Sequence, residues 1–158
     1  MKLKTGNKAP NFISIDQNEE VFDSSKLVGK KWVLYFYPKD LTPTCTIQAC
    51  NLRDHYLTLQ EKGITVIGVS ADGIRLHQRF IERHKLPFTL LSDENRNVIE
   101  AFGVWGEKKF MGRTFDGIHR STFVMNEKNE IIGIIEKPKS KIHAQEILTI
   151  YQEKEERK

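Results

Sequence analysis

Continuous apolar runs alternate along this chain with longer segments in which apolar side chains recur every third or fourth residue. The run Trp32 to Tyr37 is apolar at every position and is stopped by Pro38, which predicts a buried strand. Residues 65–70 and 88–91 predict two more buried strands. Two later runs, 121–125 and 130–135, flank the polar residues 126–129, so we expect a hairpin with a tight turn there.

Helical spacing marks the segments between these strands. The first helix carries one apolar stripe made of Cys45, Ala49, Leu52, Tyr56 and Leu59. A second helix, capped by Asp72, carries Leu76, Phe80 and Ile81, and a short helix spans 95–102. A last helix is capped by Ser140 and has an apolar stripe of Ala144, Ile147, Leu148 and Tyr151. The glycine-rich stretch 103–117 predicts a loop in which Trp105 and Phe110 serve as packing residues.

Strands that alternate with helices favour a three-layer α/β domain with a central mixed sheet. The late hairpin would add antiparallel strands to that sheet, and the whole order of elements suits a thioredoxin-like fold. A chain of 158 residues without linker or repeat predicts a single domain over 1–158, with its core at about 4–151.

The charge pattern argues against a polyanion-binding protein. The net charge is +4, but lysines and arginines are interspersed with acids, so we expect no nucleic-acid partner. The basic N-terminus has no apolar stretch behind it, and no run approaches the roughly 18 apolar residues of a membrane helix. These features predict no secretory signal, no membrane contact and a cytoplasmic protein.

Cys45 lies at the start of a predicted helix, shortly after the predicted strand that Pro38 ends. Thr42 is suited to the N-cap and Pro43 to the first helical position, which makes Cys45 the third helical residue. Unpaired backbone N–H groups and the helix dipole stabilise a thiolate at that place. Cys45 is therefore a candidate nucleophile; the alternative is an inert core cysteine at the start of an apolar stripe.

Cys50 lies five residues further along the same predicted helix. Helix geometry places it about 140° around from Cys45, with the two Cα atoms about 8.6 Å apart, beyond the roughly 7 Å limit for a disulfide. The two cysteines can therefore pair only if the first turns of the helix unwind. Alternatively, Cys50 is a spare surface cysteine. A zinc site with His55 is disfavoured, because helical steps scatter the three side chains around the helix.

Two segments carry a resemblance to a known family. Pro38, Thr42 and Cys45 match the P-x-x-x-T-x-x-C signature of peroxiredoxins, and residues 117–123 resemble the segment that supplies their active-site arginine, here Arg120. The spacing of Cys45 and Cys50 resembles the bacterioferritin comigratory protein, or Q-type, subclass. The similarity covers about residues 4–151 and implies a thiol peroxidase that reduces hydrogen peroxide and organic hydroperoxides in antioxidant defence.

The resemblance also implies roles for these residues. Cys45 would be the peroxidatic thiolate, Arg120 would stabilise it and the peroxide oxygens, Thr42 would hydrogen-bond both, and Pro38 would shield the sulfur from water. Cys50 would be the resolving cysteine, and thioredoxin or a similar dithiol would reduce the resulting disulfide. The subclass favours a monomer, and no metal, flavin or haem is called for. His119, next to Arg120, is expected on the opposite face of its strand.

Two positions depart from the subclass pattern T-P-G-C-T-x-E-A-C: Thr44 replaces a glycine and Gln48 a glutamate. Gln48 can still hydrogen-bond Arg120 but brings no negative charge, which predicts a more positive pocket around Cys45. Two other functions remain alternatives. A disulfide oxidoreductase usually has C-x-x-C, which the spacing here disfavours. A redox sensor or holdase would react with peroxide once and then stop.

Overall fold

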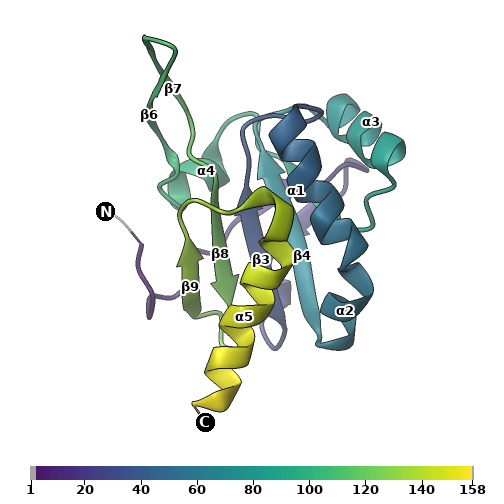
Figure 1. Cartoon of the computed structure of the whole chain (residues 1–158), viewed down its shortest axis with the longest axis vertical. Helices are drawn as coiled ribbons and strands as arrows, with labels where there is room; N and C mark the ends of the chain where they lie inside the picture. Colours follow the sequence, from purple (N-terminus) through teal and green to yellow (C-terminus); the bar gives the residue numbers. More distant parts are fainter. Residues whose placement is uncertain (1–2, 158) are drawn as a thin grey trace.

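The computed structural model describes residues 3–157; residues 1, 2 and 158 of the predicted domain lie outside this range. Its centre is a five-stranded mixed sheet with strand order β5-β4-β3-β8-β9 (Figure 1). The strands are β3 (Lys31–Phe36), β4 (Ile64–Ser70), β5 (Thr89–Ser92), β8 (Ser121–Met125) and β9 (Ile131–Ile135). β4 is parallel to both β3 and β5, while β8 is antiparallel to β3 and to β9. The predicted sheet is confirmed.

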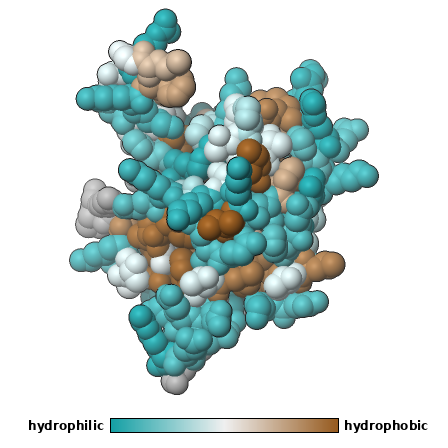
Figure 2. All heavy atoms as spheres, in the orientation of Figure 1, coloured by the Kyte–Doolittle hydropathy of each residue, from teal (hydrophilic) through white to brown (hydrophobic). Residues whose placement is uncertain are grey.

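Two helical layers cover the sheet (Figure 1). One face packs against α1 (Pro43–Asp54), α2 (Tyr56–Glu61), α3 (Ile74–His84) and α5 (His143–Glu156). The other face packs against α4 (Asn97–Ala101), the 3₁₀ turn η1 (Ser24–Leu27) and the N-terminal segment. Each face has its own hydrophobic cluster. Hydrophilic residues cover much of the α1 and α5 side, with hydrophobic residues in separate groups (Figure 2). The expected three-layer α/β architecture is confirmed.

The hairpin turn at residues 126–129 also forms as predicted. The Asn126 N–H donates to the carbonyl of Glu130 at 3.0 Å, and Asn129 takes the left-handed conformation with φ 61°. An asparagine tolerates that conformation better than most residues.

The loop predicted over residues 103–117 is wrong. This stretch forms a second hairpin, β6 (Trp105–Phe110) and β7 (Arg113–Ile118), which projects from the body of the protein (Figure 1). Met111 and Gly112 make its turn with φ of 51° and 77°. Because the hairpin projects, neither of its faces needs to be apolar, and Phe110 is 66% exposed instead of packing. Trp105 is half-buried beneath the Arg96 guanidinium, 4.3 Å from the ring centre.

The helix starts also differ from the predictions. α3 begins after Gly73, since the Asp72 carboxylate accepts hydrogen bonds from the Asp40 N–H and the Ser70 hydroxyl instead of capping the helix. Ser140 lies in the 3₁₀ turn η2 (Ser140–Ile142), and α5 begins after it. Thr42 does precede α1, but its hydroxyl makes no cap bond.

A short hairpin near the N-terminus was not predicted. Its strands are β1 (Ile13–Ile15) and β2 (Val21–Asp23), and Ile13 and Val21 are largely exposed on it. Within residues 3–157, no helix has the length and apolar character needed to cross a membrane.

Candidate active site

Cys45 occupies the first turn of α1, which lies beyond the C-terminal end of the central strand β3. Pro43 is the first helical residue, so Cys45 is the third, as predicted. The first helical hydrogen bond runs from the Thr46 N–H to the Thr42 carbonyl, at 2.9 Å. Cys45 is only 2% exposed and belongs to the same hydrophobic cluster as Ala49 and Leu52. The sulfur thus sits at a helix N-terminus that favours negative charge and is sheltered from water.

Arg120 reaches this sulfur from the link between β7 and β8. Its Nη2 donates to Cys45 Sγ at 3.2 Å, and its Nη1 donates to Gln48 Oε1 at 2.7 Å. Gln48 lies one helical turn after Cys45, so a single guanidinium joins two side chains of α1. The expected hydrogen bond between Gln48 and Arg120 is confirmed. A planar guanidinium held at two points is a fixed positive charge for a thiolate.

Gln48 brings an unusual feature to this contact. The residue is 0% exposed, and its Nε2 has no hydrogen-bond partner among the described residues. A buried amide nitrogen without a partner costs about 1–3 kcal/mol. The side chain therefore satisfies Arg120 through its oxygen while its nitrogen is left unpaired.

Thr42, Pro38 and Cys50, the other residues predicted from the sequence, show no hydrogen bond to Cys45 in the described part of the chain. Thr42 is half-buried, and its hydroxyl donates to the Lys39 carbonyl at 2.9 Å, so the expected contact with the sulfur is not formed here. Pro38 is half-buried in the link between β3 and α1. Cys50 is half-buried in the same intact helix as Cys45, and both are free thiols. The structure thus brings Cys45, Arg120 and Gln48 together and leaves Cys50 apart.

Lys108 of β6 is a neighbour of the site that sequence reasoning missed. Its Nζ donates to the Ile118 carbonyl at 2.9 Å, two residues before Arg120. Partial burial lowers the pKa of Lys108, and the charge of Arg120 lowers it further, while the Cys45 charge acts in the opposite direction. The loop predicted over residues 103–117 gives no reason to place Lys108 near the site. The sequence signal for the hairpin that carries Lys108 is the strand-forming residues on both sides of Met111 and Gly112.

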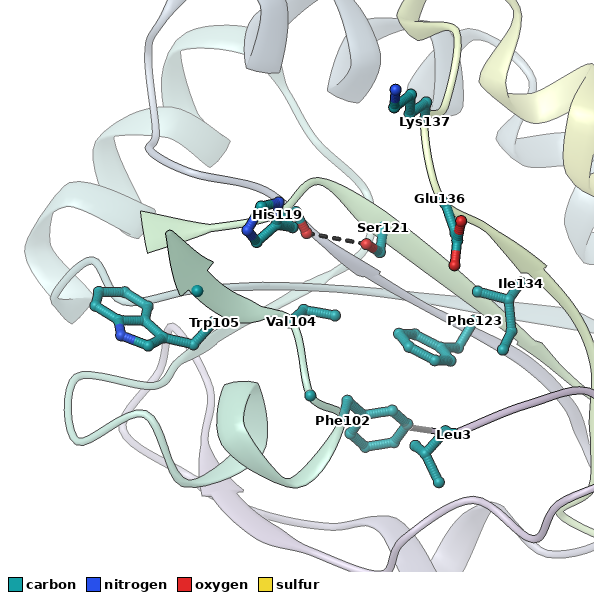
Figure 3. Close-up of a pocket in the computed structure, with 12 residues that line it drawn as sticks. Leu3, Phe102, Val104, Trp105, His119, Ser121, Phe123, Ile134, Glu136 and Lys137 are labelled. Carbon is teal, nitrogen blue, oxygen red and sulfur yellow. Dashed lines mark hydrogen bonds between the residues drawn. The ribbon is translucent and has the colours of Figure 1, made fainter. Parts of the chain in front are cut away.

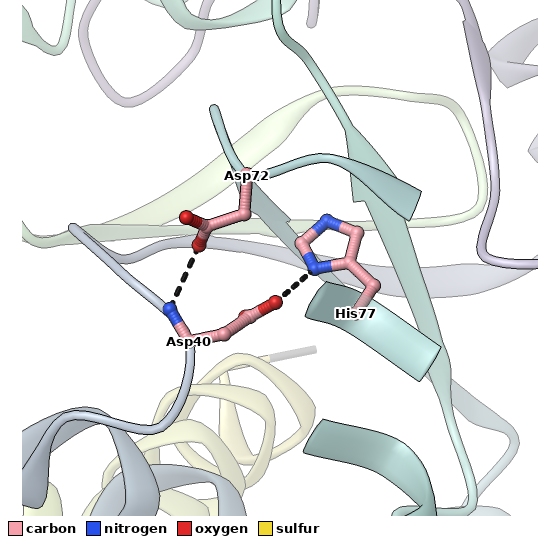
Figure 4. Close-up of side chains that lie close together, drawn as sticks. All are labelled: Asp40, Asp72 and His77. Atoms are coloured by element: carbon pink, nitrogen blue, oxygen red, sulfur yellow. Dashed lines mark hydrogen bonds and ion pairs between the residues drawn. The ribbon is translucent and has the colours of Figure 1, made fainter. Parts of the chain in front are cut away.

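A buried polar network fixes the loop before α1 (Figure 4). The Tyr37 hydroxyl donates to Asp40 Oδ1, and His77 Nδ1 lies 2.5 Å from Asp40 Oδ2. The Asp40 N–H donates to Asp72 Oδ2 at 2.7 Å, and His77 Nε2 contacts the Leu91 carbonyl at 2.8 Å. Ligand atoms of Asp40, Asp72 and His77 lie within 4.8 Å of one another, as in a metal site. However, both oxygens of Asp40 and both ring nitrogens of His77 are already hydrogen-bonded.

One sizeable cavity does not contain the Cys45 sulfur. It holds about 570 Å³ between residues 102–106, which follow α4, and strands β8 and β9, and Cys45 is not among its lining residues (Figure 3). His119 and Ser121, on either side of Arg120, line it. His119 is exposed and lies in the link between β7 and β8, so the strand position expected for it is wrong. We therefore locate the candidate site by the contact of Cys45 with Arg120 and not by this cavity.

Comparison with known proteins gives relatives that cover almost the whole chain. Residues 5–134 match the AhpC/TSA family. The chain is 51% identical to a putative peroxiredoxin bcp of Haemophilus influenzae, over 92% of this chain and 94% of that protein. It is 44% identical to peroxiredoxin Bcp of Escherichia coli, with the same coverage. The solved bacterioferritin comigratory protein of Xanthomonas campestris has a TM-score of 0.83 and 26% identity, covering 90% of this chain and 91% of that one.

These likenesses extend over almost the whole chain and include its fold, which is that of the thioredoxin-like peroxiredoxins. The sequence resemblance is confirmed: the chain belongs to the AhpC/TSA family and, within it, to the Bcp or Q-type peroxiredoxins, which are thiol peroxidases.

Proposed function

We propose that Cys45 is the peroxidatic residue and reduces hydrogen peroxide and organic hydroperoxides. The Cys45 thiolate attacks the terminal peroxide oxygen, the O–O bond breaks, and the other oxygen leaves as water or an alcohol after taking up a proton. Cys45 becomes a sulfenic acid. The single observation that carries this proposal is the 3.2 Å hydrogen bond from Arg120 to the Cys45 sulfur. The same guanidinium is placed to stabilise charge on the breaking peroxide bond.

Thr42 and Pro38 complete the proposed site. Rotation of the Thr42 hydroxyl away from the Lys39 carbonyl would let it donate to the thiolate or to the bound peroxide. Pro38 offers no N–H and would keep water from the sulfur. Organic hydroperoxides are included because the related Xanthomonas campestris protein has alkyl peroxide reduction activity.

Cys50 is the proposed resolving residue. Its thiolate attacks the sulfenic sulfur of Cys45, a disulfide forms, and the hydroxyl oxygen leaves as water. Because both cysteines lie in one intact helix, the first turns of α1 must unwind before this step. Thioredoxin or a similar dithiol then reduces the disulfide and restores both thiols. We place this cycle in the cytoplasm, where dithiol proteins are kept reduced, and assign it to the monomer.

Steady-state turnover tests the proposal. Reduced protein supplied with thioredoxin and its reductase should consume hydrogen peroxide repeatedly, and Cys45→Ser should abolish consumption. After one equivalent of peroxide, intact mass should fall by two hydrogens in the natural protein and rise by one oxygen in Cys50→Ser. One reaction per molecule, with no turnover in any dithiol system, would instead favour a sensor.

A further inference from the structure

The segment that must unwind during the proposed cycle is held at its N-terminal end by Asp40. Asp40 is 2% exposed and lies five residues before Cys45. Its side chain contacts Tyr37, directly after β3, and His77 of α3, while its N–H contacts Asp72 in the link after β4. Three separate parts of the chain thus fix one residue of the loop before α1.

The hydrogen-bond partners decide where the protons lie in this network. His77 Nε2 faces the Leu91 carbonyl, which can only accept, so Nε2 carries a hydrogen. Opposite an ionised Asp40, Nδ1 must also carry one, so His77 is an imidazolium in this pairing. Burial lowers the pKa of His77, but the hydrogen bond and charge of Asp40 together with the Leu91 carbonyl and the charge of Asp72 raise it overall.

Strained backbone follows Asp40 directly. Leu41 has φ 64°, a left-handed conformation that costs a non-glycine residue about 1–2 kcal/mol. Such a conformation persists only where the surroundings hold it. Here the Asp40 contacts hold one side of Leu41, and the first turn of α1 holds the other.

A second anchor lies directly after Cys50. Asn51 donates through Nδ2 to the Lys141 carbonyl at 2.8 Å, and its Oδ1 accepts from the Ala144 N–H at 2.7 Å. These bonds tie the middle of α1 to η2 and α5. The segment between Asp40 and Asn51 contains both cysteines and the strained Leu41, and it is the part of the chain that must rearrange for them to pair.

We propose that Asp40 and His77 form a buried latch whose hydrogen bonds hold residues 41–48 folded for peroxide attack, and whose weakening favours the unwound form in which Cys45 meets Cys50. Both are positioning residues, since neither contacts Cys45 directly. This inference rests on the proposed function of the two cysteines. Even without peroxide, the latch controls how often the start of α1 opens in the reduced protein.

Two variants and one matched control test the latch. Asp40→Ala removes both side-chain contacts. Asp40→Asn keeps them with a neutral imidazole, because the amide donates to His77 Nδ1 and its oxygen accepts from Tyr37. Asp93 provides the control: it is also 2% exposed, but it accepts hydrogen bonds from the Val98 and Ile99 N–H groups on the other face of the sheet.

Amide hydrogen exchange of the reduced proteins is the first readout. Asp40→Ala should raise exchange over residues 46–48, the first hydrogen-bonded amides of α1, by about tenfold or more relative to the rest of α1, since two buried hydrogen bonds are lost. Asp93→Ala should leave that ratio unchanged. Unchanged exchange over residues 46–48 in Asp40→Ala would overturn the latch, whatever the peroxidase assays give.

Stopped-flow kinetics is the second readout. In Asp40→Ala the peroxide-dependent phase should slow while the later peroxide-independent phase speeds up, whereas general damage to the fold would slow both. Absence of both phases in the natural protein would refute the proposed function. If the natural protein shows both phases and Asp40→Ala leaves both rates unchanged, the latch is refuted and the proposed function is not.

The dependence on pH separates the latch from a purely structural role. The titratable groups that face the pair are Tyr35 of β3, Tyr37 directly after β3, and Asp72. The pKa of His77 is raised above 6.5. The proton on His77 therefore strengthens the latch fully below about pH 6.5, and this contribution is lost as the pH rises through the raised pKa of His77. The resolution rate of the natural protein divided by that of Asp40→Asn should therefore rise with pH, since Cys50 ionisation cancels in the ratio. A flat ratio from about pH 6 to pH 9 would contradict this.

Discussion

Replacing Gln48 by glutamate tests how the charge around Cys45 is set. Gln48 and the Cys45 sulfur contact two nitrogens of the same Arg120 guanidinium, at 2.7 and 3.2 Å. A carboxylate at position 48 would therefore lie about 6 Å from the sulfur, which at an effective dielectric constant of about 20 corresponds to about 2.8 kcal/mol of repulsion. Gln48→Glu should make the thiolate less favourable relative to the thiol, by up to about 100-fold in their ratio.

The assay is alkylation by iodoacetamide, which reacts with the thiolate. It is performed at several pH values in a Cys50→Ser background, so that only Cys45 reacts. Gln48→Glu should slow alkylation at mildly acidic pH by at least about tenfold, because desolvation of the new carboxylate reduces the full Coulomb effect. Gln60→Glu makes the same change at an exposed position of α2 and should have no effect. Equal or faster alkylation in Gln48→Glu would show that the charge at position 48 does not act on the Cys45 thiolate.

Three further outcomes are expected. Arg120→Lys should slow peroxide attack by about 10²–10³-fold, because an ammonium lacks the planar fork with which the guanidinium reaches both Cys45 Sγ and Gln48 Oε1. Attack within threefold of the natural rate would exclude the proposed role of Arg120. Gly68→Ala should cost roughly 1–3 kcal/mol in urea unfolding, because the new Cβ would lie 2.7 Å from Leu90 Cδ2, and an unchanged midpoint would contradict that packing. Burial lowers the pKa of His143 below 6.5, so the protein should lose stability relative to His143→Gln as pH falls from about 7 to 5; a difference independent of pH would show that this histidine does not titrate there.

The sequence predicted the parts of the fold that are buried. The run from Trp32 to Phe36 forms the central strand because burial on both faces makes every position apolar, and the buried Tyr37 follows it directly. The position of Cys45 followed from Thr42 and Pro43, whose preferences at helix starts are local. Such features depend on neighbouring residues and need no knowledge of the tertiary structure.

The parts that the sequence did not predict either lack an apolar pattern or depend on contacts between distant segments. The projecting hairpin around Met111 lacks the apolar alternation that marks a strand, since it has no core to face. Asp72 has the right residue type for a helix cap, but the Asp40 backbone uses its carboxylate. The contact between Asp40 and His77 joins residues 37 positions apart, which spacing along the chain does not predict.

Part of the candidate site could also be predicted from the sequence. Cys45 was singled out by its place at a helix start and Arg120 by resemblance to a family, and the two meet in the structure although they lie 75 residues apart in sequence. The roles of Thr42, Pro38 and Cys50 stay predictions, because the folded state shows the site before peroxide binds or α1 unwinds.

Stopped-flow fluorescence of the reduced protein, with Trp32 and Trp105 as reporters, is the decisive measurement for the role of Cys45. We expect a fast phase that is linear in hydrogen peroxide, is orders of magnitude faster than free cysteine and is lost in Cys45→Ser. A slower, peroxide-independent phase should follow and should be absent in Cys50→Ser. A reaction no faster than that of free cysteine would contradict the proposal that Cys45 and Arg120 form a peroxidatic site.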